Sequence, residues 1–130
     1  MKAETIKKLQ SLFEKYPEIK LVYLFGSQAR GDAGPLSDYD FAAYIDEKDT
    51  IKRYNILFLL NGEISRILES DAVDTLSITD TQTPELKYDI INDGKIIFER
   101  DSYRVLVEPK ILNEFFDFTY LLKKYNLTKA

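Results

Sequence analysis

The sequence predicts an α/β fold, a small mixed β-sheet with helices mainly on one face. Runs rich in branched and aromatic residues, at 19–25, 38–45, 72–78 and 95–100, are bounded by turn-forming residues, as strands are. Between and around them, apolar residues recur at three- and four-residue spacing, which is typical of helices that cover a sheet. The 130 residues, 45% of them hydrophobic, are enough to form one compact core and too few to form two domains that each have a core of their own.

The first half of the chain predicts helix, strand, strand, helix. A helix is expected over residues 5–16, and Pro17 ends it. Its apolar face is formed by Ile6, Leu9, Phe13 and Tyr16. After the first two strands, a helix over about 50–69 returns the chain to the third strand, although Gly62 costs about 1 kcal/mol relative to alanine in a helix interior. Its apolar positions are Ile51, Leu57, Leu60, Ile64 and Ile67.

The second half predicts one more helix and the last strand, followed by a tail. Pro84 suits the first turn of a helix that ends before Gly94. We therefore divide the chain into a domain at 1–100 and a C-terminal helical extension at 101–130. We expect Pro109 to divide the extension. Beyond it lies a broad apolar face of Leu112, Phe115, Phe116, Thr119, Leu122 and Tyr125. This face either covers the open side of the sheet or docks a partner.

Gly26 and Ser27 end the first strand abruptly. Glycine lets an anion approach the backbone closely, and Ser27 opens a short helix whose first N–H groups point outward. The helix dipole adds to this preference for negative charge. The turn is therefore a candidate phosphate-binding site.

Asp38 and Asp40 alternate on the next strand, so both carboxylates point to one face of the sheet. A divalent cation removes the repulsion between two such charges, and Mg²⁺ typically takes one or two carboxylates together with phosphate oxygens. Asp74 interrupts the apolar pattern of the third strand and is the candidate third carboxylate. Paired metal ions about 3.5–4 Å apart can stabilise the attacking and leaving oxygens of a phosphoryl or nucleotidyl transfer.

Each carboxylate also has a purely structural interpretation. Asp38 could close a turn after residues 34–37, since turns favour Asp and Ser. Asp74 could lie exposed on an edge strand. Asp40 is harder to explain in this way, because it lies within a strand and strands are depleted in Asp. The three together, with the glycine turn, favour a catalytic site.

The segment from Gly26 to Asp40 resembles the GS-x10-D-x-D signature of DNA polymerase β-like nucleotidyltransferases, and the whole chain resembles their minimal nucleotidyltransferase (MNT) domains. The loop residues 29–32 and Ser37 also fit the way this loop is written in MNT proteins. The resemblance implies a palm-like fold in which Gly26 and Ser27 hold the β- and γ-phosphates of a nucleoside triphosphate. The expected ligands of two Mg²⁺ ions are Asp38, Asp40 and Asp74.

Arg30 has two interpretations of equal weight. It could neutralise phosphate charge, or it could form a salt bridge to Asp32 that shapes the loop. Gln28 is expected to face solvent.

The resemblance also implies a function. Many MNT proteins are antitoxins that transfer AMP from ATP to a tyrosine of a HEPN ribonuclease toxin, and at 130 residues we expect no second domain that could enclose a small acceptor. We therefore expect a protein adenylyltransferase antitoxin in a hetero-oligomer with its toxin. The alternatives are a binding module that neutralises its partner by contact, with a vestigial site, and a nucleotidyltransferase acting on a small molecule.

Composition excludes several other classes. With no Cys and no His, the chain has no thiolate or imidazole zinc site, disulfide framework or histidine-based triad. A net charge of −4 disfavours binding to long nucleic acids, which requires many Lys and Arg side chains. The longest apolar run, 56–60, is too short to span a bilayer. We expect a cytoplasmic protein without a membrane segment.

Overall fold

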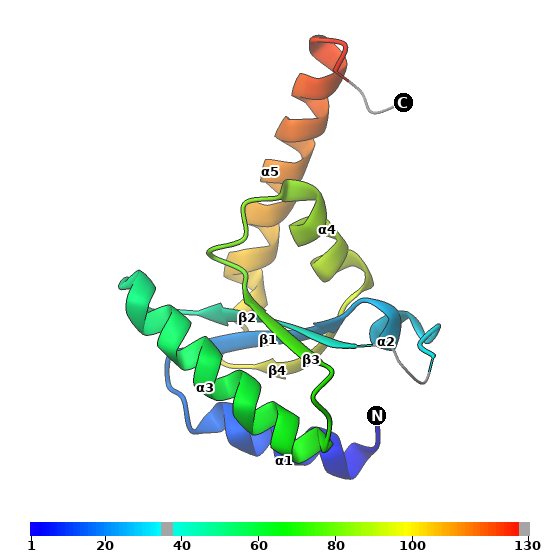
Figure 1. The fold of residues 1–130 in the computed structure, drawn as a ribbon. Coiled ribbons are helices and arrows are strands. Elements are labelled where there is room, and N and C mark those ends of the chain that lie inside the picture. The colour runs from blue at the N-terminus through cyan, green and yellow to red at the C-terminus, as the bar shows by residue number, and fades with distance from the viewer. Residues whose placement is uncertain (35–37, 128–130) are drawn as a thin grey trace.

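A four-stranded mixed sheet is the centre of the computed structural model, which describes residues 1–34 and 38–127 (Figure 1). The strand order is β3-β2-β1-β4, with β1 antiparallel to both β2 and β4 and β2 parallel to β3. The elements in chain order are α1 (Ala3–Glu14), β1 (Ile19–Phe25), α2 (Ser27–Arg30), β2 (Tyr39–Ile45), α3 (Thr50–Leu68), β3 (Val73–Ser77), α4 (Pro84–Asp93), β4 (Lys95–Glu99) and α5 (Arg104–Lys124). The mixed sheet and the order of its elements confirm the predicted fold class.

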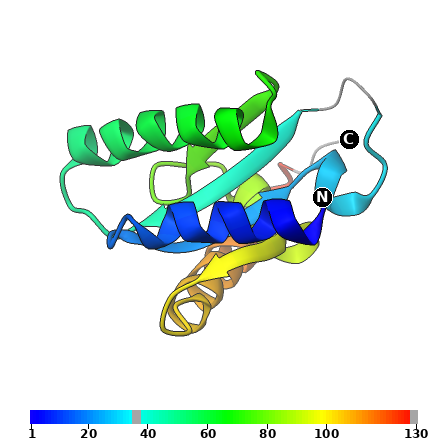
Figure 2. The same cartoon turned by 90° about the horizontal axis from the view of Figure 1, so that it is seen from below.

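The helices are divided between the two faces of the sheet. Figure 2 shows α1 and α3 side by side across one face, where the first core cluster places Phe13 and Ile64 against strand residues such as Phe41. The second cluster lies on the opposite face, where Ile90 of α4 and Val107 of α5 pack on Tyr23, Ala42 and their neighbours. The expectation that helices lie mainly on one face is therefore wrong. Both faces of the central strands are apolar, so both need cover.

The long helix α3 is oriented by an arginine that the apolar pattern did not reveal. Arg53 is only 8% exposed and donates from Nε and Nη2 to the two carboxylate oxygens of Asp80, at 2.9 and 2.7 Å. The same guanidinium bonds the backbone oxygens of Glu47 and Lys48. These hydrogen bonds connect the start of α3 to the segment after β3 and keep the Arg53 side chain buried in the protein interior. Ile51, expected on the inner face, is consequently exposed.

Pro109 does not divide the C-terminal segment, which was expected to break there. It lies inside α5, which runs without interruption from Arg104 to Lys124. Proline in a helix interior costs about 3 kcal/mol, but Val107 and Ile111 on either side of it are buried against the sheet and offset that cost.

Two polar and aromatic contacts add to the attachment of α5. The hydroxyl of Tyr23, a fully buried residue of β1, donates to Oε2 of Glu108. Further along, the rings of Tyr88 and Phe115 stack with centroids 4.1 Å apart, joining α4 to α5. Burial and the Glu108 carboxylate raise the pKa of Tyr23, so this phenol remains a donor at any physiological pH.

None of the helices described by the structure has both the length and the apolarity needed to cross a bilayer.

Replacing Tyr23 with phenylalanine tests the attachment of α5 to the sheet. The change leaves the partly buried Glu108 carboxylate without its donor and should lower the free energy of unfolding by about 1–3 kcal/mol. Tyr16→Phe is the matched control, because it removes a hydroxyl bonded to Glu63 at a less buried position and should cost less. Urea unfolding of both variants gives the comparison, and equal losses would contradict the assignment.

Candidate active site

Gly26 sits where β1 turns into α2, in a conformation that side-chain-bearing residues rarely adopt. Its φ is +73° and its ψ −154°. A Cβ built on Gly26 would lie 2.6 Å from Oδ2 of Asp40, which is closer than two such atoms can come. Both backbone conformation and space therefore require glycine here. The turn brings the backbone of residue 26 directly against the Asp40 carboxylate.

The helix that follows the turn is only one turn long. The carbonyl oxygen of Gly26 accepts hydrogen bonds from the N–H groups of Ala29 and Arg30, each at 3.1 Å, and Gly31 ends α2 in the left-handed region. A helix of four residues has a small dipole, so the case for anion binding rests on close approach to glycine and on the half-buried Ser27 rather than on the helix dipole.

Asp40 and Asp74 are directly opposite each other across the parallel pair β2–β3. Both lie on the face covered by α4 and α5, because Ala42 and Leu76, two residues further along each strand, belong to the core cluster of that face. The pair is fixed at its start by the Tyr39 N–H, which donates to the carbonyl oxygen of Ala72 at 2.8 Å. The strand register thus places two carboxylates side by side.

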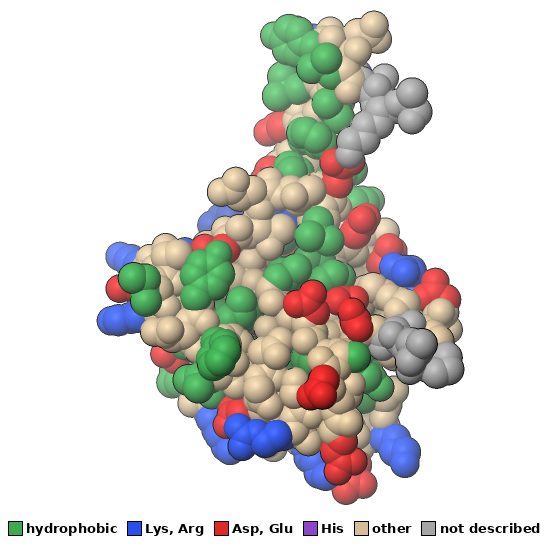
Figure 3. All heavy atoms as spheres, in the orientation of Figure 1, with side chains coloured by type: hydrophobic (Ala, Val, Ile, Leu, Met, Phe, Trp, Pro, Cys, Tyr) green, Lys and Arg blue, Asp and Glu red, His purple; other side chains and the backbone are tan. Residues whose placement is uncertain are grey.

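Asp38 comes immediately before β2 rather than within it, and it is exposed. Its neighbours on the N-terminal side, including the predicted Ser37, lie outside the described residues. Figure 3 shows acidic side chains gathered on the face of the molecule near β3 and the α2 loop.

The electrostatic environment of Asp40 identifies it as the centre of this group. Its pKa is raised, first by burial and then by the negative charges of Asp74 and Asp38, while Arg30 lowers it. The three carboxylates and Arg30 therefore lie within electrostatic range of one another. Asp40 is partly buried, whereas Asp38 and Asp74 are exposed.

A metal ion would fit this arrangement through a subset of the carboxylates. Within residues 1–34 and 38–127, no three acidic side chains form a preassembled metal-binding group. Mg²⁺ does not require one, since one or two carboxylates suffice when phosphate oxygens and water complete the shell. Oxygen donors carrying uncompensated negative charge beside a glycine turn suit a magnesium triphosphate. The roles of Asp38, Asp40 and Asp74 as ligands stay predictions.

Of the two interactions expected of Arg30, the ion pair with Asp32 is observed. Its Nε donates to Oδ2 of Asp32 at 3.3 Å, with both side chains at least half exposed. An exposed ion pair of this kind contributes at most about 1 kcal/mol, so it does not fix the side chain. Because Arg30 also acts on the charge of Asp40, a role toward phosphate stays a prediction beside the observed ion pair.

Gln28 differs from its expected solvent-facing position. It is half buried and lines a hollow of about 540 Å³ beside the α2 loop, together with Tyr39, Ala72 and other residues. Tyr39 alternates with Asp38 and Asp40, so it points to the opposite side of β2 and forms a wall of this hollow. This alternation in the sequence was the signal that could have placed Tyr39 on the side of β2 opposite the carboxylates.

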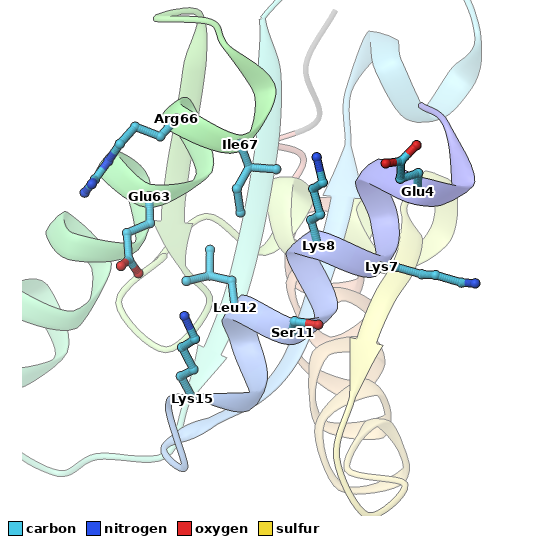
Figure 4. Close-up of a pocket in the computed structure, with 9 residues that line it drawn as sticks. All are labelled: Glu4, Lys7, Lys8, Ser11, Leu12, Lys15, Glu63, Arg66 and Ile67. Carbon is cyan, nitrogen blue, oxygen red and sulfur yellow. The ribbon is translucent and has the colours of Figure 1, made fainter.

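A second hollow, the groove between α1 and α3, lies on the other face of the sheet and holds about 520 Å³ (Figure 4). Leu12 of α1 and Ile67 of α3 face each other in it, while Lys7 and Arg66 point outward. Its acidic residues, Glu4 and Glu63, come from helix surfaces and are not aligned by strand pairing. The carboxylates of β2 and β3 belong to the opposite face, so this groove is separate from the candidate site.

Comparisons with known proteins place this geometry among nucleotidyltransferases. A family model described as polymerase beta, nucleotidyltransferase matches residues 7–103. The protein adenylyltransferase MntA of Aphanizomenon flos-aquae (strain 2012/KM1/D3) is 31% identical over 113 residues, covering 75% of this chain and 71% of that protein.

Solved structures share the fold over nearly the whole chain. A toxin–antitoxin crystal structure with AMP-PNP matches with a TM-score of 0.73 at 22% identity, covering 96% of this chain and 95% of that one. The complex of a tri-AMPylated Shewanella oneidensis HEPN toxin with an MNT antitoxin matches with a TM-score of 0.71 at 20% identity and the same coverage. At these identities the likeness shows the fold, including the long C-terminal helix.

The raised pKa of Asp40 predicts how stability depends on pH in the metal-free protein. Folded Asp40 binds its proton at a higher pH than it does in the unfolded chain, so protonation favours the folded state. Asp40→Asn should therefore be more stable than the unchanged protein at about pH 7 in the presence of a chelator, and this difference should shrink as the pH falls toward about 5.

The measurement is urea unfolding at both pH values, with Asp32→Asn as the control. Asp32 is an exposed loop carboxylate, and its replacement should change stability little at either pH. A metal-free Asp40→Asn protein that is less stable at neutral pH would contradict the inferred cost of burying the charged Asp40 carboxylate beside Asp74 and Asp38.

Proposed function

The chain belongs to the polymerase β-type nucleotidyltransferase family, and from this premise we propose that it transfers AMP from ATP to a hydroxyl group, a tyrosine of a HEPN ribonuclease toxin, and so acts as an antitoxin. The observation that carries the proposal is the register of β2 and β3. It holds Asp40 opposite Asp74 and against the Gly26 turn. The carboxylate oxygens therefore lie beside a stretch of backbone that a phosphate can approach closely.

In this proposal Gly26 and Ser27 hold the β- and γ-phosphates, while Asp38 and Asp40 hold two Mg²⁺ ions with the triphosphate. When bound, Mg²⁺ neutralises the triphosphate and stabilises charge on the attacking and leaving oxygens. Burial, followed by the negative charges of Asp74 and Asp38, raises the pKa of Asp40, and a bound cation would relieve the cost of keeping this carboxylate charged. Arg30, attached to Asp32 by an exposed contact, can turn toward phosphate.

The reaction is a substitution at the α-phosphorus of ATP. The acceptor hydroxyl oxygen forms a bond to that phosphorus, the bond to the pyrophosphate oxygen breaks, and pyrophosphate leaves with the electron pair. Asp74 takes the hydroxyl proton. Its exposed position on the edge strand puts it where an acceptor would arrive from solvent.

A protein acceptor is supported by the relatives and by the open site. The relative from Aphanizomenon is a protein adenylyltransferase, and a structural relative is an MNT antitoxin in complex with an AMPylated HEPN toxin. Asp38 and Asp74 are exposed, and none of the described elements covers them. We therefore propose a hetero-oligomer in which the toxin completes the site. Since ATP is the donor, we place the activity in the cytoplasm.

A non-catalytic antitoxin is the competing function. Such a protein would gain nothing from three carboxylates that repel one another beside a glycine turn, because this arrangement costs stability. Transfer to a small molecule has no specific observation in its favour, since no described element encloses an acceptor above the carboxylates.

Asp38→Asn and Asp40→Asn should abolish transfer. Each removes a charge that binds the metal triphosphate, and the rate should fall by on the order of a hundredfold or more. The measurement is the mass of a HEPN protein co-expressed with each variant, in which adenylate-sized gains report transfer. Asp32→Asn, which removes a carboxylate between α2 and β2, should leave transfer largely intact. Neutralisation of the toxin without any mass gain would support the contact-only antitoxin instead.

Mg²⁺ and ATP together should raise the melting temperature of the isolated chain. A ligand that binds only the folded state at about one hundred times its Kd stabilises it by about 2.7 kcal/mol. Mg²⁺ alone should have a smaller effect, because the carboxylates are not preassembled around a metal. Differential scanning fluorimetry with Asp38→Asn alongside provides the check, and equal stabilisation of that variant would show that the nucleotide binds elsewhere.

A further inference from the structure

The outer half of α5 leaves the body of the protein with apolar side chains on its surface. Val107 and Ile111 are the buried residues of α5, and Phe115 makes the last stacking contact, with Tyr88 of α4. Beyond this point the helix projects away from the sheet (Figure 1). The remaining turns carry exposed aromatic and aliphatic side chains instead of the polar surface expected of a solvated helix.

These exposed side chains form two stripes at helical spacing. Phe116 and Tyr120, 57% and 63% exposed, are four residues apart and share one stripe. Leu121 and Tyr125, 49% and 61% exposed, are also four apart and lie on roughly the opposite side of the helix. We call these four residues the distal α5 surface. Apolar stripes on two sides of a projecting helix mark a surface that a partner covers, because monomers rarely expose such area.

The distal α5 surface lies on the same side of the sheet as the candidate active site. The base of α5 packs in the second core cluster, with Ala42 of β2 and Leu76 of β3. Asp40 and Asp74 lie two residues before these positions on the same strands, and therefore on the same face. In Figure 1, α5 rises from this face while α1 and α3 cover the other. A partner held along α5 would therefore sit on the side from which the carboxylates are reached.

We infer that the distal α5 surface is the docking site for helices of the toxin, positioned so that a toxin bound there presents its tyrosine to Asp40 and Asp74. This inference rests on the proposed function. Two stripes at helical spacing suit ridge-into-groove packing against partner helices. Their aromatic composition matches that of interface anchors.

A second copy of this chain fits the distal α5 surface less well. A two-fold pair of α5 helices would bury one stripe of each helix and leave the opposite stripe exposed. Two chains of net charge −4 also repel each other. A toxin whose helices contact both sides of α5 covers the whole surface.

The chain offers a matched control on another helix. Ile51 and Phe58 of α3 are 72% and 80% exposed, so they are apolar residues at least as exposed as those of α5. They belong to the helix that covers the opposite face of the sheet. Paired substitutions at the two places remove comparable exposed apolar area and differ in position.

The experiment compares Phe116→Ala/Tyr120→Ala and Leu121→Ala/Tyr125→Ala with the control Ile51→Ala/Phe58→Ala. Each protein is purified and titrated with a HEPN toxin, and the affinity is measured by titration calorimetry. Loss of two aromatic or aliphatic anchors should weaken binding by about a hundredfold or more, since buried anchors dominate interface energies. The control should bind within a fewfold of the unchanged chain.

Folding is monitored independently. Alanine favours helix, so circular dichroism and the ATP-dependent rise in melting temperature should be unchanged in all variants. Hydrogen exchange of the unchanged complex adds a readout that needs no variant, with new protection expected over residues 115–127. Full-affinity binding by both α5 variants, equal weakening by the α3 control, or a dimer of this chain that the α5 variants disrupt would each overturn the inference.

Failure of this inference can be distinguished from failure of the proposed function. Asp38→Asn should bind the toxin normally while losing transfer, and the α5 variants should lose binding while retaining the nucleotide response. A complex that depends on α5 but gains no adenylate mass would refute adenylyl transfer and leave the docking surface standing. Normal adenylylation by both α5 variants would refute the docking surface alone.

Discussion

The parallel pairing of β2 with β3 is the constraint on which the rest of the molecule depends. It sets Asp40 opposite Asp74 and so concentrates negative charge at the start of two strands. Of these two carboxylates, Asp40 is partly buried. A charged Asp40 is unfavourable there, because burial and then the negative charges of Asp74 and Asp38 raise its pKa. The arrangement persists because the same strands continue into fully buried apolar residues such as Phe41 and Ala43, whose packing fixes the register. A shift by one residue would turn the carboxylates into the core.

The local patterns of the sequence predicted the strands, the glycine turn and the positions of the carboxylates well, because these depend on alternation and on residues next to each other in the chain. They failed where a distant partner decided the outcome. Arg53 is inside because Asp80, 27 residues away, accepts its guanidinium, and this rotates Ile51 outward. Pro109 remains within α5 because the sheet buries the residues around it. The second covered face likewise depends on packing between α4 and α5.

The candidate site shows the same division. Gly26, Asp38, Asp40 and Asp74 could be selected from residue type and spacing, whereas the position of Gln28 in a hollow with Tyr39 could not, because it depends on how the loop after α2 folds back. For Arg30 the alternatives were not resolved by sequence, and the structure shows why. A long exposed side chain can pair with Asp32 and still act on Asp40, so a choice between them depends on the bound phosphate.

The openness of the site connects its chemistry to the shape of the chain. Transfer to a hydroxyl requires that the acceptor be held in line with the α-phosphorus and that water be kept away, and positioning alone accounts for a large part of such rate enhancements. The sheet supplies the charged group and the glycine turn, but no described element closes over them. In the proposed complex, the bound acceptor supplies that wall. A helix that projects from the same face with apolar residues on two sides is a means of holding a large acceptor, and it would be of no use to a small one. The fold therefore favours a protein substrate on geometric grounds that do not depend on the identity of its relatives.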